Sequence, residues 1–106
     1  MSQADVIKIV INYLNVLKQA GIPVEKAYLY GSYARNQAKE DSDIDILLIS
    51  QIFDTNDDYI LSQPWLYTTK VDHRIEPIAM GTKRFQTDDV SPVIQIVRQE
   101  GIEIQT

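Results

Sequence analysis

Two aspartates stand out because of their spacing and their position. Asp43 and Asp45 lie two residues apart at the start of the apolar run DIDILLIS, residues 43–50. Side chains at positions i and i+2 of a strand leave the same face, so these two carboxylates are expected side by side. Neighbouring carboxylates repel one another and lose hydration, and a cation bound between them relieves both effects. Hard oxygen ligands suit Mg²⁺, so the pair is a candidate metal site.

A Gly-Ser pair, Gly31 and Ser32, follows the short apolar segment KAYLY at residues 26–30. A strand that turns at a glycine into a helix exposes backbone N–H groups that favour a phosphate. Ser32 adds a hydroxyl donor, and Arg35 adds positive charge one helical turn away. Alone, a Gly-Ser pair is usually an ordinary turn and Asp-x-Asp is usually a solvated strand end. Together they indicate a clamp for a magnesium-bound triphosphate.

The segment GSYARNQAKEDSDIDILL, residues 31–48, resembles the signature of the DNA polymerase β-like nucleotidyltransferase superfamily. That signature is Gly-Ser followed, after a spacer, by Asp-x-Asp. The closer resemblance is to the minimal nucleotidyltransferases (MNT) of bacteria and archaea, whose motif often reads G-S-x-A-R-G and then S-D-x-D. Asn36 stands where those proteins often have glycine. Because asparagine tolerates a left-handed conformation, we expect the turn to survive.

The resemblance implies a metal-dependent enzyme that moves an NMP from an NTP, with ATP favoured, to an acceptor hydroxyl. Gly31, Ser32 and Arg35 would bind the nucleotide, and Asp43 and Asp45 would hold two Mg²⁺ ions at the catalytic centre.

The same resemblance implies a third carboxylate on a later strand, serving both the metal and catalysis. Glu76, within RIEPIAM at residues 74–80, is our first choice. Neighbouring strands lie about 4.8 Å apart, so a carboxylate on an adjacent strand can share a metal with the aspartates. Asp72 has the same strand parity and is the second choice, although it is expected at a loop edge.

A partner protein is also implied, because MNT proteins often accompany a helical HEPN protein as antitoxin to toxin. The chain would then either modify that partner or act as a non-catalytic binding module that neutralises it by forming a complex. A homo-oligomer is a further expectation, because a chain of 106 residues has only a modest core.

Composition narrows the classes of protein. The formal net charge of −5 argues against general nucleic-acid binding, which needs an excess of Lys and Arg. No apolar run approaches the ~20 residues of a membrane span, so no membrane association is expected. The start of the chain does not resemble a signal peptide, and the absence of cysteine excludes disulfides. We therefore expect one cytoplasmic domain that covers residues 1–106.

The expected fold is α/β (α+β), a small mixed sheet with helices packed on it in the order α-β-α-β-α-β-α. The 43–50 strand should be central because both of its faces become apolar beyond Asp45. Pro77 favours an edge position for the strand at 74–80, and Pro64 is expected to divide a helical stretch.

The helices are expected at residues 3–20, 32–37, 57–62 with 65–69, and from 91 to Gly101, and a last short strand at 102–104. Ser2, with Asp5 three residues on, is expected to cap the first helix. Ser91 with Pro92 is expected to start the last one.

Three aromatic residues, Phe53, Tyr67 and Trp65, could stack on a nucleotide base, although core or partner contacts are the favoured interpretation. The lone histidine, His73, is interpreted as a surface residue.

Overall fold

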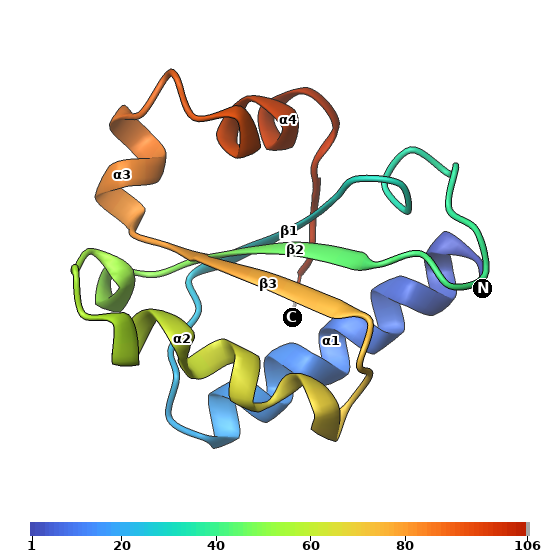
Figure 1. The fold of residues 1–106 in the computed structure, drawn as a ribbon, viewed down its shortest axis with the longest axis horizontal. Helices are drawn as coiled ribbons and strands as arrows, with labels where there is room; N and C mark the ends of the chain where they lie inside the picture. Colours follow the sequence, from blue (N-terminus) through green and yellow to red (C-terminus); the bar gives the residue numbers. More distant parts are fainter. Residues whose placement is uncertain (106) are drawn as a thin grey trace.

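A mixed four-stranded sheet lies between two layers of helices in the computed structural model, which describes residues 1–105 (Figure 1). Strand order is β3-β2-β1-β4. The central pair is β1 (Lys26–Tyr30) and β2 (Ile44–Ile49), which run antiparallel. On the outside, β3 (Ile75–Met80) is parallel to β2, and β4 (Ile102–Glu103) is antiparallel to β1. The predicted α/β fold is confirmed, while Thr106 lies outside the described residues.

Helix α1 (Gln3–Gln19) begins at a capping box, as its sequence predicts. The Ser2 hydroxyl accepts from the Asp5 amide, and the Asp5 carboxylate accepts from the Ser2 amide. Beyond the helix, Gly21 adopts a φ of 84°, the left-handed conformation that ends a helix readily. One stripe of the helix is buried against the sheet and comprises Val6, Val10, Tyr13, Leu14 and Leu17.

The helix expected at residues 32–37 is instead a single turn. Asn36 takes a φ of 56°, so the turn survives the replacement of glycine, as predicted. The Gln37 amide donates to the Ser32 carbonyl and the Asn36 amide to the Tyr33 carbonyl, which is the hydrogen-bond pattern of a Schellman motif. This early closure prevents a longer helix. We call residues 31–36 the glycine turn.

Pro64 does not divide the helical stretch, contrary to the sequence-based prediction. Helix α2 runs without a break from Asp58 to Leu66 and lies between two short 3₁₀ helices, η1 (Gln51–Phe53) and η2 (Thr68–Lys70). A proline this near the C-terminal end removes one backbone hydrogen bond. The buried Tyr13 hydroxyl donates to the Pro64 carbonyl over 2.6 Å, so packing against α1 stabilises the segment.

The two faces of β2 contact different helices, as its alternation predicts. Ile44, Ile46 and Leu48 pack in the core under α1 and α2, whereas Leu47 and Ile49 pack in a second core beneath α4 (Pro92–Glu100). Helix α3 (Thr82–Thr87) lies on that same side of the sheet (Figure 1). Since Asp45 shares the parity of Leu47, its side chain belongs to the side of α3 and α4.

The remaining predictions from proline and glycine positions are confirmed. Pro77 lies in the edge strand β3, where a missing N–H is tolerated. Ser91 and Pro92 start α4, and Gly101 ends it.

None of the helices formed by the described residues has the length and apolar character that crossing a bilayer requires.

Candidate active site

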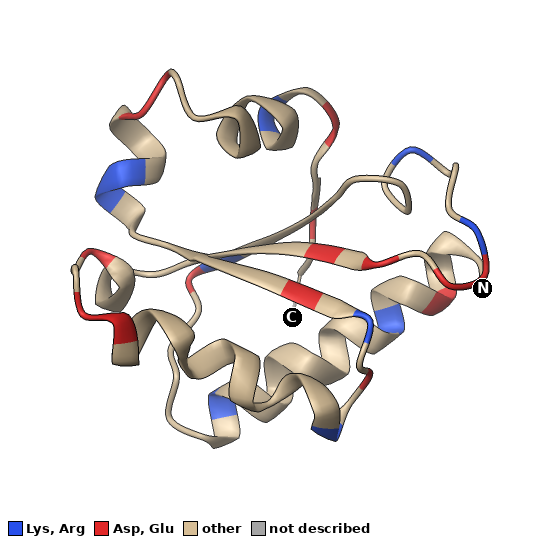
Figure 2. Ribbon diagram, in the orientation of Figure 1, with Lys and Arg blue, Asp and Glu red and all other residues tan. Residues whose placement is uncertain are grey.

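The acidic residues of β2 and β3 meet because of strand register. Asp45 lies directly across from Glu76 in the parallel β2–β3 pair. Asp43 immediately precedes β2, two residues before Asp45 and on the same side of the strand. Acidic segments of the two strands accordingly lie side by side in Figure 2. We call Asp43, Asp45 and Glu76 the acidic site.

Gly31 approaches the acidic site from the end of β1. Tyr30 pairs with Asp45 in the antiparallel β1–β2 ladder, so the next residue lies beside that carboxylate. Gly31 has a φ of 79°, and a Cβ added to it would overlap Oδ2 of Asp45. Only glycine therefore combines this backbone conformation with this close approach.

Electrostatic repulsion is already evident at Asp45. Burial, Glu76 and Asp43 together raise the pKa of the Asp45 carboxyl from 3.8 to about 6, although Arg35 acts in the opposite direction. Burial also raises the pKa of Tyr30 to about 12, with further contributions from Asp45 and Glu76. The half-buried centre of the site thus carries an excess of negative charge that a cation would neutralise.

The donor set fits a divalent cation in its chemistry. Three carboxylates supply the hard oxygen ligands that Mg²⁺ prefers, and the raised pKa of Asp45 reflects the charge that a metal would offset. Among residues 1–105, however, no three acidic, histidine or cysteine side chains are already close enough together to coordinate a metal. Asp43 and Glu76 are exposed, so their side chains have room to move towards Asp45.

The glycine turn is held from two sides. The Tyr33 ring is buried in the core beneath it, and the Tyr33 hydroxyl donates to the Lys39 carbonyl over 3.4 Å. Across the chain, the Gln3 side-chain amide donates to the carbonyls of Tyr33 and Ala34 over 3.0 and 3.3 Å. These contacts fix the backbone that presents Gly31, Ser32 and Arg35.

Asp72, the second choice for the third carboxylate, is engaged elsewhere. Its carboxylate contacts the Arg74 guanidinium at 2.6 Å, and hydrogen bonds from Arg74 hold the pKa of Asp72 below its usual range. Arg74 in turn donates to the Glu40 carbonyl and so braces the loop that leads into β2. The contacts of Asp72 therefore support a loop, whereas Glu76 lies across from Asp45.

Glu100 is the contact residue that the sequence did not point to. Its Oε1 accepts from the Gly31 amide at 3.2 Å and from the Arg35 guanidinium at 2.8 Å. Glu100 is the last residue of α4, where the helix dipole disfavours a negative charge. In the sequence, an acidic residue at the end of a helix is a signal that its side chain has a cationic or N–H partner, and it was the one signal that could have identified Glu100.

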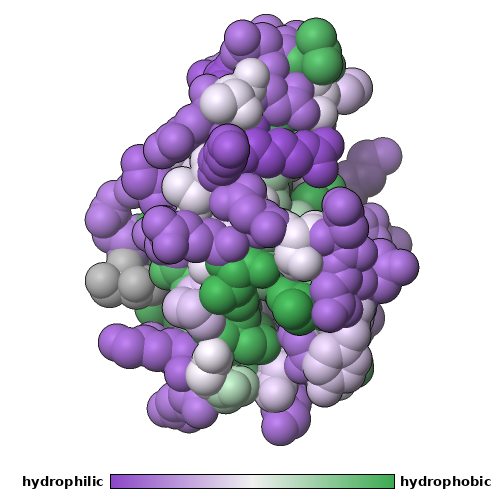
Figure 3. Space-filling view, turned by 90° about the vertical axis from the view of Figure 1, so that its left-hand side faces the viewer, coloured by the Kyte–Doolittle hydropathy of each residue, from purple (hydrophilic) through white to green (hydrophobic). Residues whose placement is uncertain are grey.

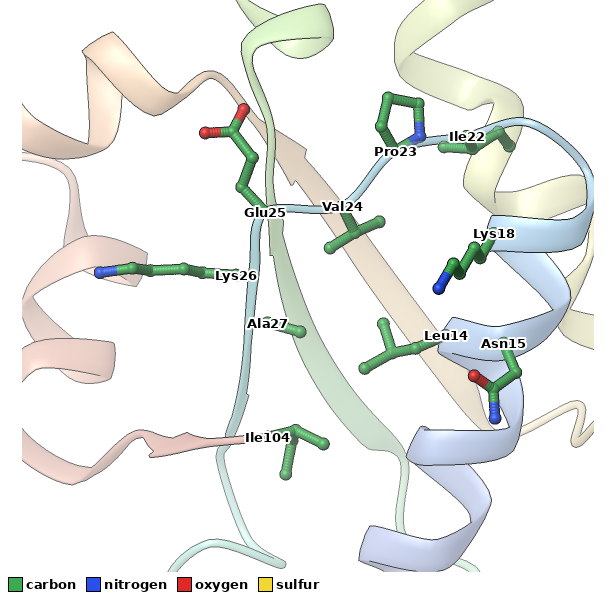
Figure 4. Close-up of a pocket in the computed structure, with 10 residues that line it drawn as sticks. All are labelled: Leu14, Asn15, Lys18, Ile22, Pro23, Val24, Glu25, Lys26, Ala27 and Ile104. Atoms are coloured by element: carbon green, nitrogen blue, oxygen red, sulfur yellow. The ribbon is translucent and has the colours of Figure 1, made fainter. Parts of the chain in front are cut away.

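The aromatic side chains considered for base stacking lie apart from the acidic site. Phe53 is buried in the core under α1 and α2, and Tyr67 packs against that core. A cavity of about 380 Å³ opens on this same side, between α1 and β1, where Leu14, Ala27 and Ile104 point towards one another (Figure 4). The cavity and the acidic site thus occupy opposite faces of the sheet.

The sequence profile of one protein family, described as the nucleotidyltransferase domain, matches residues 10–100. The chain belongs to this family. As a nucleotidyltransferase domain, it falls among enzymes that transfer nucleotidyl groups, which agrees with the class inferred from Gly31, Ser32, Asp43 and Asp45. No curated protein sequence matches it.

Solved structures of low sequence identity share the fold of this nucleotidyltransferase domain. A protein from Sulfolobus solfataricus assigned as a nucleotidyltransferase is 16% identical, with a TM-score of 0.66 over 95% of this chain and 80% of that one. A toxin–antitoxin structure with AMP-PNP is 24% identical, with a TM-score of 0.60 over 89% and 71%. A mutant of the toxin–antitoxin MntA-HpeT is 19% identical, with a TM-score of 0.53 over 99% and 73%.

Proposed function

We propose that this protein is a Mg²⁺-dependent nucleotidyltransferase that moves AMP from ATP to an acceptor hydroxyl. The observation that carries the proposal is that Asp45 lies across from Glu76, two residues after Asp43 and against Gly31, in a chain of the nucleotidyltransferase family. In the reaction, the acceptor oxygen attacks the α-phosphorus, a new P–O bond forms, and the bond to the β-phosphate bridging oxygen breaks. The acceptor loses its proton, and pyrophosphate leaves with the bonding electron pair.

Each group of residues has a defined task in this proposal. Gly31 and Ser32 offer an N–H and a hydroxyl to the β- and γ-phosphates, and Arg35 offsets their charge. Asp43, Asp45 and Glu76 would hold two Mg²⁺ ions. When bound, these ions supply charge stabilisation for the attacking and leaving oxygens. Glu76 would also accept the proton of the acceptor hydroxyl, and its exposed position across from Asp45 supports this role.

The test is a double substitution, Asp43→Asn with Asp45→Asn. Both changes preserve side-chain size and remove negative charge, so the fold should persist while Mg²⁺-dependent transfer from labelled ATP disappears. Circular dichroism checks the fold, and Asp41→Asn is the matched control because it removes an exposed charge in the same loop. Undiminished transfer by the double variant would rule the mechanism out.

We also propose a helical, HEPN-type partner protein, with a hydroxyl of that partner as the acceptor. Tyr59, Trp65 and Leu66 of α2 are 73%, 49% and 62% exposed, so this helix offers large side chains that a partner could cover. An apolar area, ringed by hydrophilic side chains, lies on the face shown in Figure 3. Two similar structures are toxin–antitoxin structures, which supports a partnered role.

A mixing experiment separates modification from simple binding. The protein, the product of the neighbouring gene and Mg-ATP are combined, and the partner is weighed by intact-mass spectrometry. A mass gain of one adenylyl group supports transfer to the partner. A stable complex with no mass gain supports the second candidate function, a non-catalytic module that neutralises its partner by binding.

A further inference from the structure

One carboxylate oxygen already accepts hydrogen bonds from two of the donors that the proposed function assigns to the triphosphate. Oε1 of Glu100 accepts both from the Gly31 amide and from the Arg35 guanidinium, at 3.2 and 2.8 Å. A carboxylate and a phosphate are similar anions for such donors. In the described structure, therefore, an anion supplied by the chain itself accepts from both of these donors.

The position of Glu100 in its own helix does not explain this arrangement. Glu100 ends α4, where the carbonyl ends of the helix make a negative charge unfavourable. Its two partners precede it by 69 and 65 residues, so the contact joins the end of α4 to the glycine turn through space. The ion pair is also accessible, because Arg35 and Glu100 keep 44% and 23% of their side-chain surface exposed.

Competition follows from the chemistry of the donors. The Gly31 amide has a single hydrogen and cannot serve Glu100 and a phosphate fully at the same time. A triphosphate that approaches Arg35 would also meet the negative charge of Glu100 at close range. Glu100 must therefore leave before Gly31 and Arg35 can both contact a nucleotide.

We propose that Glu100 is a displaceable gate of the nucleotide site, which occupies the Gly31 amide and Arg35 when the site is empty. This inference rests on the proposed function, since it takes the triphosphate site to include Gly31 and Arg35. The gate is weak enough to open, because an exposed ion pair changes an equilibrium constant only by a factor of about two to five. The gate changes the affinity for the triphosphate, whereas the transfer step depends on the acidic site.

The experiment measures binding of inorganic tripolyphosphate with Mg²⁺ to the whole chain by titration calorimetry. Glu100→Gln removes the charge, and Glu100→Ala removes the side-chain acceptor as well. Both should lower the Kd about two- to ten-fold, because the competing anion and its repulsion are gone. Glu103→Gln is the matched control, because Glu103 lies three residues on in β4 and contacts Tyr28 and Gln105. An unchanged or raised Kd in both Glu100 variants would overturn the gate.

A second readout follows the Gly31 amide by NMR. Tripolyphosphate should shift the Gly31 resonance in the unmodified protein, and Glu100→Gln alone should shift it before any ligand is added. A Gly31 chemical shift that does not change on addition of tripolyphosphate in any variant would also overturn the gate.

Transfer from labelled ATP is assayed in parallel, so that the two proposals can fail separately. Tighter tripolyphosphate binding in the Glu100 variants without any transfer in the unmodified protein supports the gate and counts against the proposed function. Transfer in the unmodified protein with no change in Kd on substitution supports the proposed function and overturns the gate. If tripolyphosphate binds to no form of the protein, the gate falls, and the proposed function falls with it only if no transfer from ATP is seen either.

Discussion

At the scale of single residues, Gly31 meets two independent requirements, one of backbone conformation and one of space. Gly31→Ala should destabilise the fold by at least about 1–2 kcal/mol, because φ is 79° and an L-residue is strained there. The new Cβ would also displace the Asp45 carboxylate. We therefore expect lower stability in urea unfolding and the loss of Mg-ATP binding in calorimetry.

Gly21 provides the matched control for this substitution. It has a similar φ of 84°, but a Cβ added there meets no atom within 4 Å. Gly21→Ala should show the backbone strain alone and leave nucleotide binding unchanged. Equal losses of binding in the two variants would contradict a specific contact between Gly31 and Asp45.

Asp45 links the charge of the acidic site to stability. Burial, Glu76 and Asp43 raise its pKa from 3.8 to about 6, so the folded protein holds this proton more tightly than the unfolded chain does. The destabilisation by the charged carboxylate is complete above pH 6 and is lost as pH falls towards 3.8. Without metal, Asp45→Asn should therefore increase the free energy of unfolding at pH 7.5 by about 1 kcal/mol, after allowance for solvent screening.

Urea unfolding at pH 7.5 and pH 4.5 tests this prediction. The gain from Asp45→Asn should shrink at the lower pH, where the wild-type carboxyl is protonated in the folded protein. Asp41→Asn, in the exposed loop nearby, should give a much smaller gain at pH 7.5. A gain that is the same at both pH values would exclude the carboxylate charge as its cause.

At the scale of elements, the contact between α1 and α2 explains why Pro64 is compatible with a helix. The buried Tyr13 hydroxyl donates to the Pro64 carbonyl over 2.6 Å. Tyr13→Phe should lower the free energy of unfolding by about 1 kcal/mol, the usual net value of such a bond. Thermal unfolding measures the loss, and Tyr59→Phe, at an exposed position of α2, should cost less than half as much.

The sequence was informative wherever structure follows from local pattern. Alternation of apolar residues predicted the two faces of β2, Pro77 predicted an edge strand, and the capping box at Ser2 predicted the start of α1. These signals act between residues that are close along the chain or through the pleat of a strand. They sufficed to place Asp43 and Asp45 together on one face.

Two kinds of feature were beyond such patterns, namely where a turn closes and how distant elements contact one another. The helix expected at residues 32–37 is a single turn for a local reason, because the Schellman closure at Asn36 comes too soon. Pro64 was expected to divide a helix that tertiary packing keeps whole. The contact of Glu100 with Gly31 depends on how α4 crosses the sheet, which no spacing in the sequence specifies.

For the whole molecule, ligand binding should stabilise the fold, because the proposed site joins β1, β2 and β3. Mg-ATP at about a hundred times its Kd adds about 2.7 kcal/mol to the free energy of unfolding. For a chain of this length the midpoint of thermal unfolding should then rise by about 10 °C or more. The variant with Asp43→Asn and Asp45→Asn should show a far smaller rise, and equal shifts would place the nucleotide away from the acidic site.

The hydrogen bonds from Gln3 to the Tyr33 and Ala34 carbonyls limit how short a fragment could be and still bind a nucleotide. Every residue proposed to bind nucleotide or metal lies between positions 31 and 76, which invites excision of that segment by itself. However, the glycine turn takes two of its backbone contacts from the first turn of α1, and Tyr33 packs into the core that α1 covers. A peptide that begins at β1 would retain the whole motif and lose the support that shapes it.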